Sequence, residues 1–315
     1  MQKRKLGRTG LDIVPLVLGG NVFGWTADEK TSFEILDRFL AAGLNAIDTA
    51  DAYSTWVPGN SGGESETIIG KWMKSRGNRD SVVLITKVGS DMGQGKKDLS
   101  AAYIEKAIEA SLRRLQTDAI DLYFSHWPDP TVPYEETLGA YEKLLKKGKI
   151  RHIGASNLDA AQLSDALNVA REKGLPPYEV LQPEYNLYDR SSYDGPLRDL
   201  CMGEGLGVIT YFSLAKGFLS GKYRSEADLG KSARGGGIKH YLDARGMRIL
   251  AALDAVSARH SARQAEVALA WVIARQGVTA PIASATSVEQ VDSLAKAASL
   301  ALSPEDIAEL DRASA

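Results

Sequence analysis

Short apolar runs alternate with amphipathic segments along the chain. Val82–Ile85 is an uninterrupted apolar run of strand length, and residues 26–40 carry apolar side chains at helical spacing. This alternation predicts eight strands, at residues 15–20, 44–47, 81–87, 120–126, 150–157, 180–182, 207–211 and 279–282. It predicts helices at residues 26–40, 65–75, 100–114, 134–147, 158–173, 193–204, 245–260, 262–276 and 287–297, and one that starts at 303.

Eight strands that are each followed by a helical segment favour a parallel sheet. The polar residues at the strand ends recur every ~25–40 residues, the size of a βα unit. In a chain of 315 residues, this repeat fits a closed (β/α)8 barrel better than an open doubly wound sheet, which would need strand-order reversals that the sequence cannot show. Residues 3–14 form two short runs around a glycine-containing turn. We therefore expect an α/β fold, a (β/α)8 TIM barrel with an N-terminal β-hairpin and extra helices, as a single domain over residues 1–315.

Several helix ends carry recognisable signals. Capping boxes are predicted at Thr26–Glu29 and Ser261–Gln264, and an N-cap at Ser100. The segment Lys216–Lys239 has no clear periodicity and contains three consecutive glycines. A loop of that length inside a compact domain is usually functional or mobile.

Composition narrows the class of protein. Apolar residues make up 44% and charged residues 25% of the chain, as in ordinary globular proteins. The net charge of -2 provides no basic surface, so we expect neither a nucleic-acid nor a membrane partner. No apolar run approaches the ~20 residues of a membrane span, and the basic N-terminus lacks the apolar stretch of a secretory signal. The single cysteine, Cys201, leaves no internal disulfide and no multi-cysteine metal site. A cytoplasmic protein without a bound metal is expected.

Three predicted strands end on polar side chains. Asp48, Lys87 and His126 follow apolar runs, and Tyr53 stands in the loop after Asp48. In a barrel the carboxyl ends of the strands converge on one face, so these four side chains would lie together. Each alone has a structural interpretation: an ion pair, a core histidine or a packed loop aromatic. As a set they are harder to explain, because burying an ammonium and an imidazole costs stability.

The four groups assemble chemically into a proton donor. A phenol keeps its proton at neutral pH, and a nearby ammonium stabilises the phenolate, which makes Tyr53 a better acid. Asp48 would keep Lys87 charged and oriented. A neutral His126 would hydrogen-bond a carbonyl oxygen beside the Tyr53 hydroxyl. This is an electrophilic pocket for a C=O group that receives negative charge.

Asp48, Tyr53, Lys87 and His126, in this order and spacing, resemble the catalytic tetrad of the aldo-keto reductase superfamily. The resemblance extends over nearly the whole chain through the segments 48–53, 125–129, 154–157, 182–186 and 217–223. It implies a (β/α)8 barrel that binds NADPH in an extended pose and reduces aldehydes or ketones to alcohols. Hydride would come from the nicotinamide and the proton from Tyr53. A G-x-G-x-x-G fingerprint after a strand is absent from the sequence, as expected for this family.

The resemblance also implies a set of cofactor contacts. Ser156, Asn157 and Gln182 match contacts to the nicotinamide carboxamide, and Tyr211 matches the ring that stacks on the nicotinamide. The segment that wraps the pyrophosphate and the positions that reach phosphates are matched by Tyr211, Phe212, Ser213, Leu214, Ala215, Gly217, Lys222, Arg234, Ser284, Thr286 and Gln290. Thr286 stands where the family often has Arg at the adenosine 2′-phosphate, and Leu294 where an Asn commonly contacts adenine. We expect NADPH as the cofactor, with NADH not excluded.

The substrate pocket is expected from tryptophans on loops at the same rim. Trp25, Trp56 and Trp127 follow predicted strands one, two and four and would form an aromatic wall or, structurally, anchor their loops. The glycine-rich segment Val57–Gly63 beside Tyr53 suggests a cover over the pocket. The partner expected is a small carbonyl compound, bound by a monomer or weak homo-oligomer.

Two other functions are compatible with the sequence. An NADPH-binding regulatory or sensor subunit with little turnover can keep the tetrad intact. A Schiff-base lyase would use Lys87 as an amine nucleophile, which requires an uncharged lysine.

Overall fold

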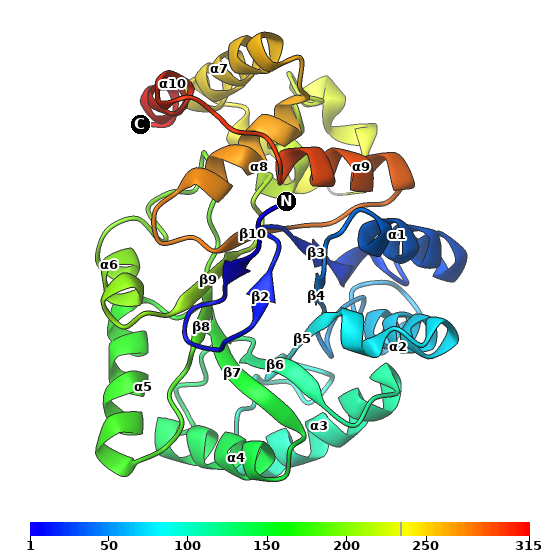
Figure 1. The fold of residues 1–315 in the computed structure, drawn as a ribbon, viewed down its shortest axis with the longest axis vertical. Helices are drawn as coiled ribbons and strands as arrows, with labels where there is room; N and C mark the ends of the chain where they lie inside the picture. Colours follow the sequence, from blue (N-terminus) through cyan, green and yellow to red (C-terminus); the bar gives the residue numbers. More distant parts are fainter. Residues whose placement is uncertain (234) are drawn as a thin grey trace.

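The computed structural model describes residues 1–233 and 235–315, and its centre is a closed barrel of eight parallel strands (Figure 1). The strands follow one another around the barrel in chain order, and the last pairs with the first through Ile282 and Val17. They are β3 (Val17–Gly19), β4 (Ala46–Asp48), β5 (Val83–Val88), β6 (Ile120–Ser125), β7 (Ile150–Ser156), β8 (Val180–Gln182), β9 (Gly207–Thr210) and β10 (Ala280–Ala283). The predicted TIM barrel is confirmed.

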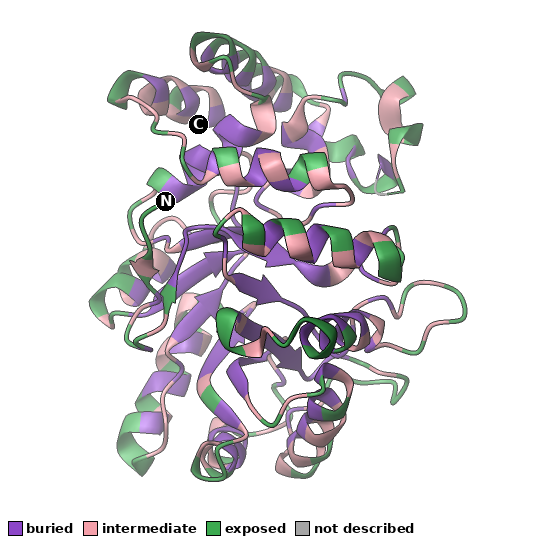
Figure 2. Cartoon of the chain, turned by 45° about the vertical axis from the view of Figure 1, so that its right-hand side comes forward, coloured by how far each residue is buried: buried purple, intermediate pink, exposed green. Residues whose placement is uncertain are grey.

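Helices surround the barrel and turn their apolar faces toward it (Figure 2). They are α1 (Glu29–Ala41), α2 (Glu64–Arg76), α3 (Ala101–Leu115), α4 (Tyr134–Lys146), α5 (Ala160–Lys173), α6 (Pro196–Gly203), α7 (Ala244–His260), α8 (Gln264–Ala274), α9 (Val288–Ala297) and α10 (Pro304–Ser314). The extra helices α7 and α10 pack against each other at one end of the molecule (Figure 1). Within the described residues, no helix is long and apolar enough to span a membrane.

Two predicted capping boxes are not formed as expected. Asp28, not Thr26, caps α1, because its carboxylate accepts from the Thr31 amide at 2.8 Å. Ser261 instead ends α7 with a φ of 49°, and α8 starts three residues later. Both predicted boxes were therefore wrong. Ser100 does cap α3, as expected.

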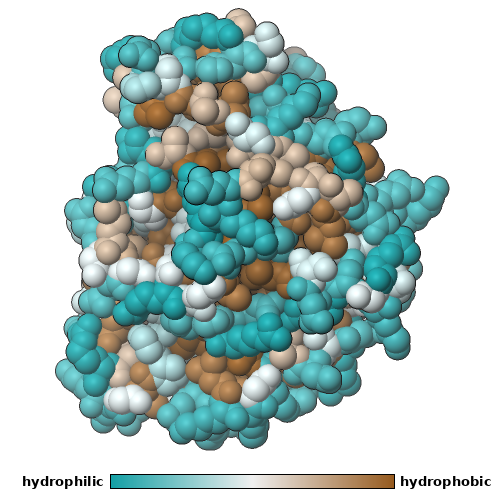
Figure 3. Space-filling view, viewed as in Figure 1, coloured by the Kyte–Doolittle hydropathy of each residue, from teal (hydrophilic) through white to brown (hydrophobic). Residues whose placement is uncertain are grey.

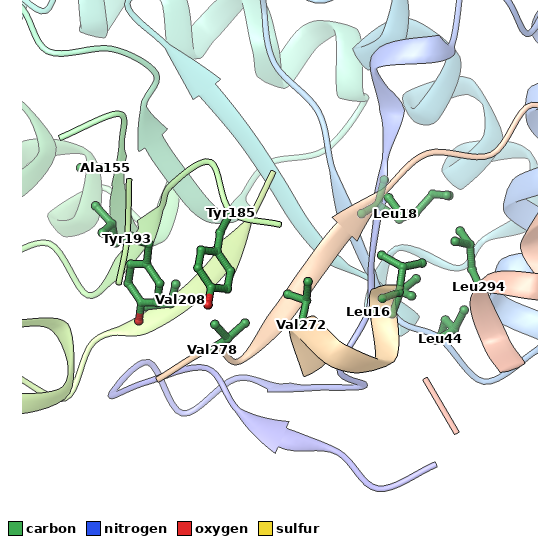
Figure 4. Packing of buried hydrophobic residues seen from close by; sticks show 14 of the residues in the cluster. Leu16, Leu18, Leu44, Ala155, Tyr185, Tyr193, Val208, Val272, Val278 and Leu294 are labelled. Atoms are coloured by element: carbon green, nitrogen blue, oxygen red, sulfur yellow. The ribbon is translucent and has the colours of Figure 1, made fainter. Parts of the chain in front are cut away.

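The core forms two layers on either side of the strands. The outer layer packs the helices on the barrel, as where Leu16 and Leu18 approach Leu294 of α9 (Figure 4). The inner layer fills the barrel with one or two apolar side chains from most strands, among them Ile85, Leu122 and Ile209. Such filling makes the barrel a packed core, so only its rim is available for chemistry.

An antiparallel hairpin of β1 (Arg4–Lys5) and β2 (Asp12–Ile13) confirms the predicted N-terminal element. Leu6 and Ile13 belong to the inner core layer, so the hairpin closes one mouth of the barrel. Hydrophilic residues cover much of the surface on the face seen in Figure 3, with apolar patches broken up between them. The opposite mouth, at the carboxyl ends of the strands, carries the site described below.

The aperiodic segment 216–239 folds largely as short 3-10 turns. They are residues Ala215–Ser220, Glu226–Lys231, Gly235–Gly237 and Lys239–Tyr241. Buried Tyr223, Ile238 and Tyr241 anchor the segment in the core. Ser232 and Ala233 reach the wall of the cavity described below.

Two helical glycines should respond oppositely to alanine. A Cβ on Gly70 of α2 would lie 2.1 Å from the Arg114 carbonyl oxygen of α3, so Gly70→Ala should lower the free energy of unfolding by about 1–3 kcal/mol. Gly139 of α4 has open space around it, so Gly139→Ala should raise it by about 0.5–1 kcal/mol. Urea unfolding of both variants measures the difference, and equal effects would contradict this account of the α2–α3 contact.

Candidate active site

Polar side chains from three neighbouring strands meet at the carboxyl mouth of the barrel. Asp48 is the last residue of β4, Lys87 the next-to-last of β5, and His126 follows β6 directly. Tyr53 lies in the turn after β4. The parallel register of β4, β5 and β6 places these ends side by side. The sequence therefore predicted the convergence of the four groups, although β5 continues one residue past Lys87.

The Lys87 ammonium is fully buried and has three acceptors. Its Nζ lies 2.6 Å from Asp48 Oδ2, 2.7 Å from the Tyr53 hydroxyl oxygen and 2.9 Å from the Thr49 carbonyl oxygen. Burial lowers the pKa of Lys87, and the Asp48 carboxylate opposes that shift. All three donors of the ammonium are thus satisfied, and one of them points at the phenol.

Asp48 is held from both sides. Its Oδ2 also accepts from the Tyr53 hydroxyl at 3.1 Å, and its Oδ1 accepts from the Gln182 amide nitrogen at 2.9 Å. Gln182 ends β8, far from β4 along the chain. This carboxylate therefore ties the ammonium, the phenol and a strand on another part of the barrel into one network.

His126 is neutral in this setting. Burial, followed by the charges of Lys87 and Lys97, holds the pKa of its imidazole well below the ordinary value. Its Nδ1 lies 2.9 Å from Ser90 Oγ, and its ring stacks on Trp127 with centroids 5.8 Å apart. The Tyr53 ring is 6.0 Å away, so imidazole and phenol flank the same space.

A cavity of about 910 Å³ opens from this cluster. That volume lies within the range of small-molecule and cofactor sites. Of the predicted site residues, the lining includes Asp48, Tyr53, Trp56, His126, Trp127, Ser156, Asn157, Gln182, Tyr211, Phe212, Ser213, Leu214, Gly217, Lys222, Ser284, Thr286 and Gln290. Lys87 and Ala215 are buried behind the wall. Arg234 lies outside the described residues.

The residues expected to contact the nicotinamide are hydrogen-bonded to one another or to His126. Asn157, with a φ of 63°, accepts from the Tyr211 hydroxyl at 2.7 Å and donates to the His126 carbonyl oxygen at 2.8 Å. Ser156 Oγ donates to the Gln182 carbonyl oxygen at 2.8 Å. These bonds fix the wall between the tetrad and β9.

The loop after β9 has an unusual backbone. Phe212, Ala215 and Lys216 adopt positive φ values of 49°, 48° and 56°, followed by Gly217 at 101°. Left-handed backbone costs free energy for residues other than glycine, and such turns can direct successive amides toward an anion. The Ala215 and Gly217 amides donate to the Phe212 and Leu214 carbonyl oxygens, so the loop would offer a phosphate group its other amides.

The cavity's far end lies at the start of α9. Thr286 donates through its amide to Gln290 Oε1 at 2.9 Å, and Ser284 Oγ donates to Asn21 Oδ1 at 2.5 Å. The guanidinium-bearing Arg263, at the start of α8, also lines this end. The cavity is therefore basic away from the tetrad.

The three tryptophans take different places. Trp56 and Trp127 line the cavity, and Trp56 is 48% exposed. Trp25 is not among the described residues that line the cavity. Its ring instead contacts the Trp56 ring edge-on, with centroids 5.6 Å apart. Trp25 thus supports the aromatic rim from behind.

Sequence reasoning missed several lining residues. Asn21, Ser90 and Glu184 each follow a strand end by a few residues, so their position was a usable signal. Arg263 had no such signal, because it starts a helix remote in sequence from the other residues at that end. Its place depends on how α8 packs beside α9.

Asp51 is a buried carboxyl outside the tetrad. Its Oδ1 has no hydrogen-bond partner among the described residues, and neither does the buried hydroxyl of Tyr123. Glu66, paired with Arg114 and Thr86, adds a second negative charge nearby. Burial first, and then Glu66, raise the pKa of Asp51 to about 8.

Comparisons with known proteins agree with this geometry. The profile of the Aldo/keto reductase family matches residues 15–315. The uncharacterized oxidoreductase YrpG of Bacillus subtilis is 38% identical over 317 residues, covering 97% of this chain and 93% of the relative. The aldo-keto reductase YhdN of the same organism is 34% identical, covering 92% and 85%. The norsolorinic acid reductase of Aspergillus flavus is 31% identical, covering 96% and 78%.

Asp51→Asn should change how stability depends on pH. The raised pKa of Asp51 means that the folded state keeps a proton that the unfolded chain releases above pH about 4, so this carboxyl lowers stability as the pH rises toward 8. The asparagine variant lacks that loss. Urea unfolding should therefore show that the free energy of unfolding of the variant rises relative to that of the wild type as the pH increases from about 5 to about 8.5.

The matched control is Asp80→Asn, at an exposed position. Its pH profile provides the baseline for removing a surface carboxyl. An effect of Asp51→Asn on stability that does not change with pH would contradict the assignment of a proton to the folded-state carboxyl.

Proposed function

The chain belongs to the aldo/keto reductase family and is an NAD(P)H-dependent oxidoreductase of carbonyl compounds, and we propose that Tyr53 supplies the proton in this reaction. The proposal extends to the reduction of aldehydes and ketones to alcohols with NADPH. Its main support is the 2.7 Å contact between Lys87 Nζ and the Tyr53 oxygen.

The size, loop backbone and charge of the cavity fit the cofactor. Its volume, the left-handed loop at 212–217 and the basic far end with Lys222 and Arg263 suit an anionic dinucleotide. The cofactor, when bound, supplies hydride to the carbonyl carbon. Ser156, Asn157, Gln182 and Tyr211 would hold its nicotinamide end.

The chain's own residues complete the reduction. As the carbonyl carbon gains hydride, its oxygen gains negative charge and takes the proton of the Tyr53 hydroxyl. The resulting phenolate is stabilised by the Lys87 ammonium, whose charge Asp48 holds in place. Neutral His126 orients the carbonyl oxygen, and Trp56 and Trp127 provide apolar walls for the substrate.

The other functions considered receive less support. A Schiff-base lyase needs a free amine, whereas the Lys87 ammonium is committed to three acceptors. A sensor subunit would bind NADPH with little turnover. Measuring NADPH oxidation together with NADPH binding distinguishes the sensor from the reductase.

Tyr53→Phe should abolish most of the reductase activity. Loss of a positioned general acid costs about 10²–10⁴-fold in kcat. The measurement is NADPH oxidation with 4-nitrobenzaldehyde, together with the Kd of NADPH, which should stay within a factor of about two because the phenol contributes to chemistry rather than to affinity.

Tyr134→Phe, on α4 away from the cavity, is the matched control and should retain full activity. Retained activity in Tyr53→Phe would overturn the assignment of the proton donor. Tight NADPH binding by the wild type without turnover would favour the sensor.

The preference for NADPH is proposed to depend on Arg263. With Thr286 in place of an arginine, Arg263 is the arginine that the described residues contribute to the far end of the cavity. Arg263→Ala should raise the Kd of NADPH about tenfold, the effect of losing one charge-assisted hydrogen bond, and leave the Kd of NADH unchanged.

Arg113→Ala on α3 serves as the charge-matched control, because Arg113 is exposed and is not part of the cavity wall. Fluorescence titration with both cofactors provides the two constants. Equal weakening of NADPH and NADH by Arg263→Ala would refute a role in selecting the phosphate.

A further inference from the structure

Ser90 lies in the cavity wall beside His126. It stands three residues after Lys87, in the loop that follows β5, and only 8% of its surface is exposed. Its carbonyl oxygen accepts from the Gln94 side chain at 2.9 Å, which helps to fix the loop. Its hydroxyl oxygen lies 2.9 Å from His126 Nδ1.

The direction of that hydrogen bond follows from counting donors and acceptors. A neutral imidazole has one N–H donor and one acceptor nitrogen. If Nδ1 carried the hydrogen, the Ser90 hydroxyl would accept, and its own hydrogen would have no acceptor among the described residues. If Ser90 donates to Nδ1, the hydroxyl hydrogen is paired, and the imidazole hydrogen is on Nε2, where a bound ligand or solvent in the cavity can accept it. A nearly buried hydroxyl favours the second arrangement, because an unmade hydrogen bond is costly.

The surroundings of His126 keep the ring neutral, which the tautomer argument requires. The titratable groups that face it are Lys87 from β5, Tyr53 from the turn after β4, and Lys97. Lys97 Nζ lies 4.4 Å from the centroid of Trp127, which in turn stacks on His126. Two cations thus disfavour an imidazolium, and burial acts in the same direction.

The backbone also restricts how His126 can move. The His126 amide donates to the Val88 carbonyl oxygen at 2.8 Å, and the His126 carbonyl oxygen accepts from Asn157. The ring therefore has a fixed base, and Ser90 is the hydrogen-bonding partner of its Nδ1. Nε2 remains as the ring nitrogen available to the cavity.

We propose that Ser90 is a positioning residue that fixes the Nε2–H tautomer of His126, so that the imidazole donates a hydrogen bond to a substrate oxygen beside Tyr53. The tautomer assignment rests on the Ser90–His126 contact, the neutral ring and the count of donors and acceptors, and it is independent of any reaction. Its use in orienting a carbonyl rests on the proposed function. An imidazole with the opposite tautomer would present a lone pair and repel a carbonyl oxygen.

The tautomer can be measured directly by NMR on protein labelled with ¹⁵N-histidine. The chain has four histidines, so the difference from a His126→Gln spectrum assigns the ring signals. The wild type should show a protonated Nε2 and an unprotonated, hydrogen-bonded Nδ1 at neutral pH. In Ser90→Ala the two nitrogens should move toward averaged values of a tautomer mixture. A proton on Nδ1 in the wild type, or an unchanged Ser90→Ala spectrum, would overturn the proposal whether or not the protein reduces carbonyls.

Steady-state kinetics test whether the tautomer of His126 matters for the reduction. Ser90→Ala should lower kcat for 4-nitrobenzaldehyde about tenfold, the worth of one hydrogen bond in the transition state, with the Kd of NADPH unchanged. Ser90→Thr restores the hydroxyl and should recover most of the loss. Ser299→Ala, which removes an exposed serine hydroxyl on the surface, should have no effect. A confirmed tautomer with full kcat in Ser90→Ala would refute the positioning role, whereas absence of activity in the wild type would refute the reductase proposal and leave the NMR result standing.

Discussion

The buried ion pair between Lys87 and Asp48 is the interaction on which the candidate site depends. Both side chains are almost completely inaccessible, and their charges are separated by 2.6 Å. Taking two charges out of water is costly, and removing one partner of such a pair costs about 3–5 kcal/mol. The pair is tolerable only if every remaining hydrogen-bonding position is filled. Thr49, Tyr53 and Gln182 fill them, so satisfying the lysine also fixes the phenol.

The two ends of the cavity differ in net charge. At the tetrad the ammonium is balanced by one carboxylate, and the imidazole next to it is neutral. At the other end, Lys222 and Arg263 leave a positive surface. A ligand with a negatively charged portion and an uncharged reactive portion therefore has one favourable orientation in the cavity, with its uncharged part at Tyr53.

The strands of the barrel and the tetrad were predictable from the sequence for the same physical reason. Strands buried on both faces are short apolar runs, and a charged residue at the end of such a run stands out, as Asp48 and Lys87 do. Helix starts were less predictable, since Thr26 and Asp28 are both good caps and the choice depends on the local turn. Arg263 could not be assigned, because an arginine before a helix is common and only tertiary packing brings it to the cavity. The position of Trp25 behind Trp56 likewise depends on how two loops meet.

Closure of the barrel has a consequence for how copies of this chain can associate. Each of the eight strands has a hydrogen-bonded neighbour on both sides, so the barrel offers no open row of backbone amides and carbonyls. The only other strands in the described residues are the two-residue members of the hairpin, which are too short to template a third. Self-association through strand addition, a common route to fibrils and swapped dimers, is therefore closed to the folded barrel. Any assembly must use helices and loops, where side chains rather than backbone choose the partner.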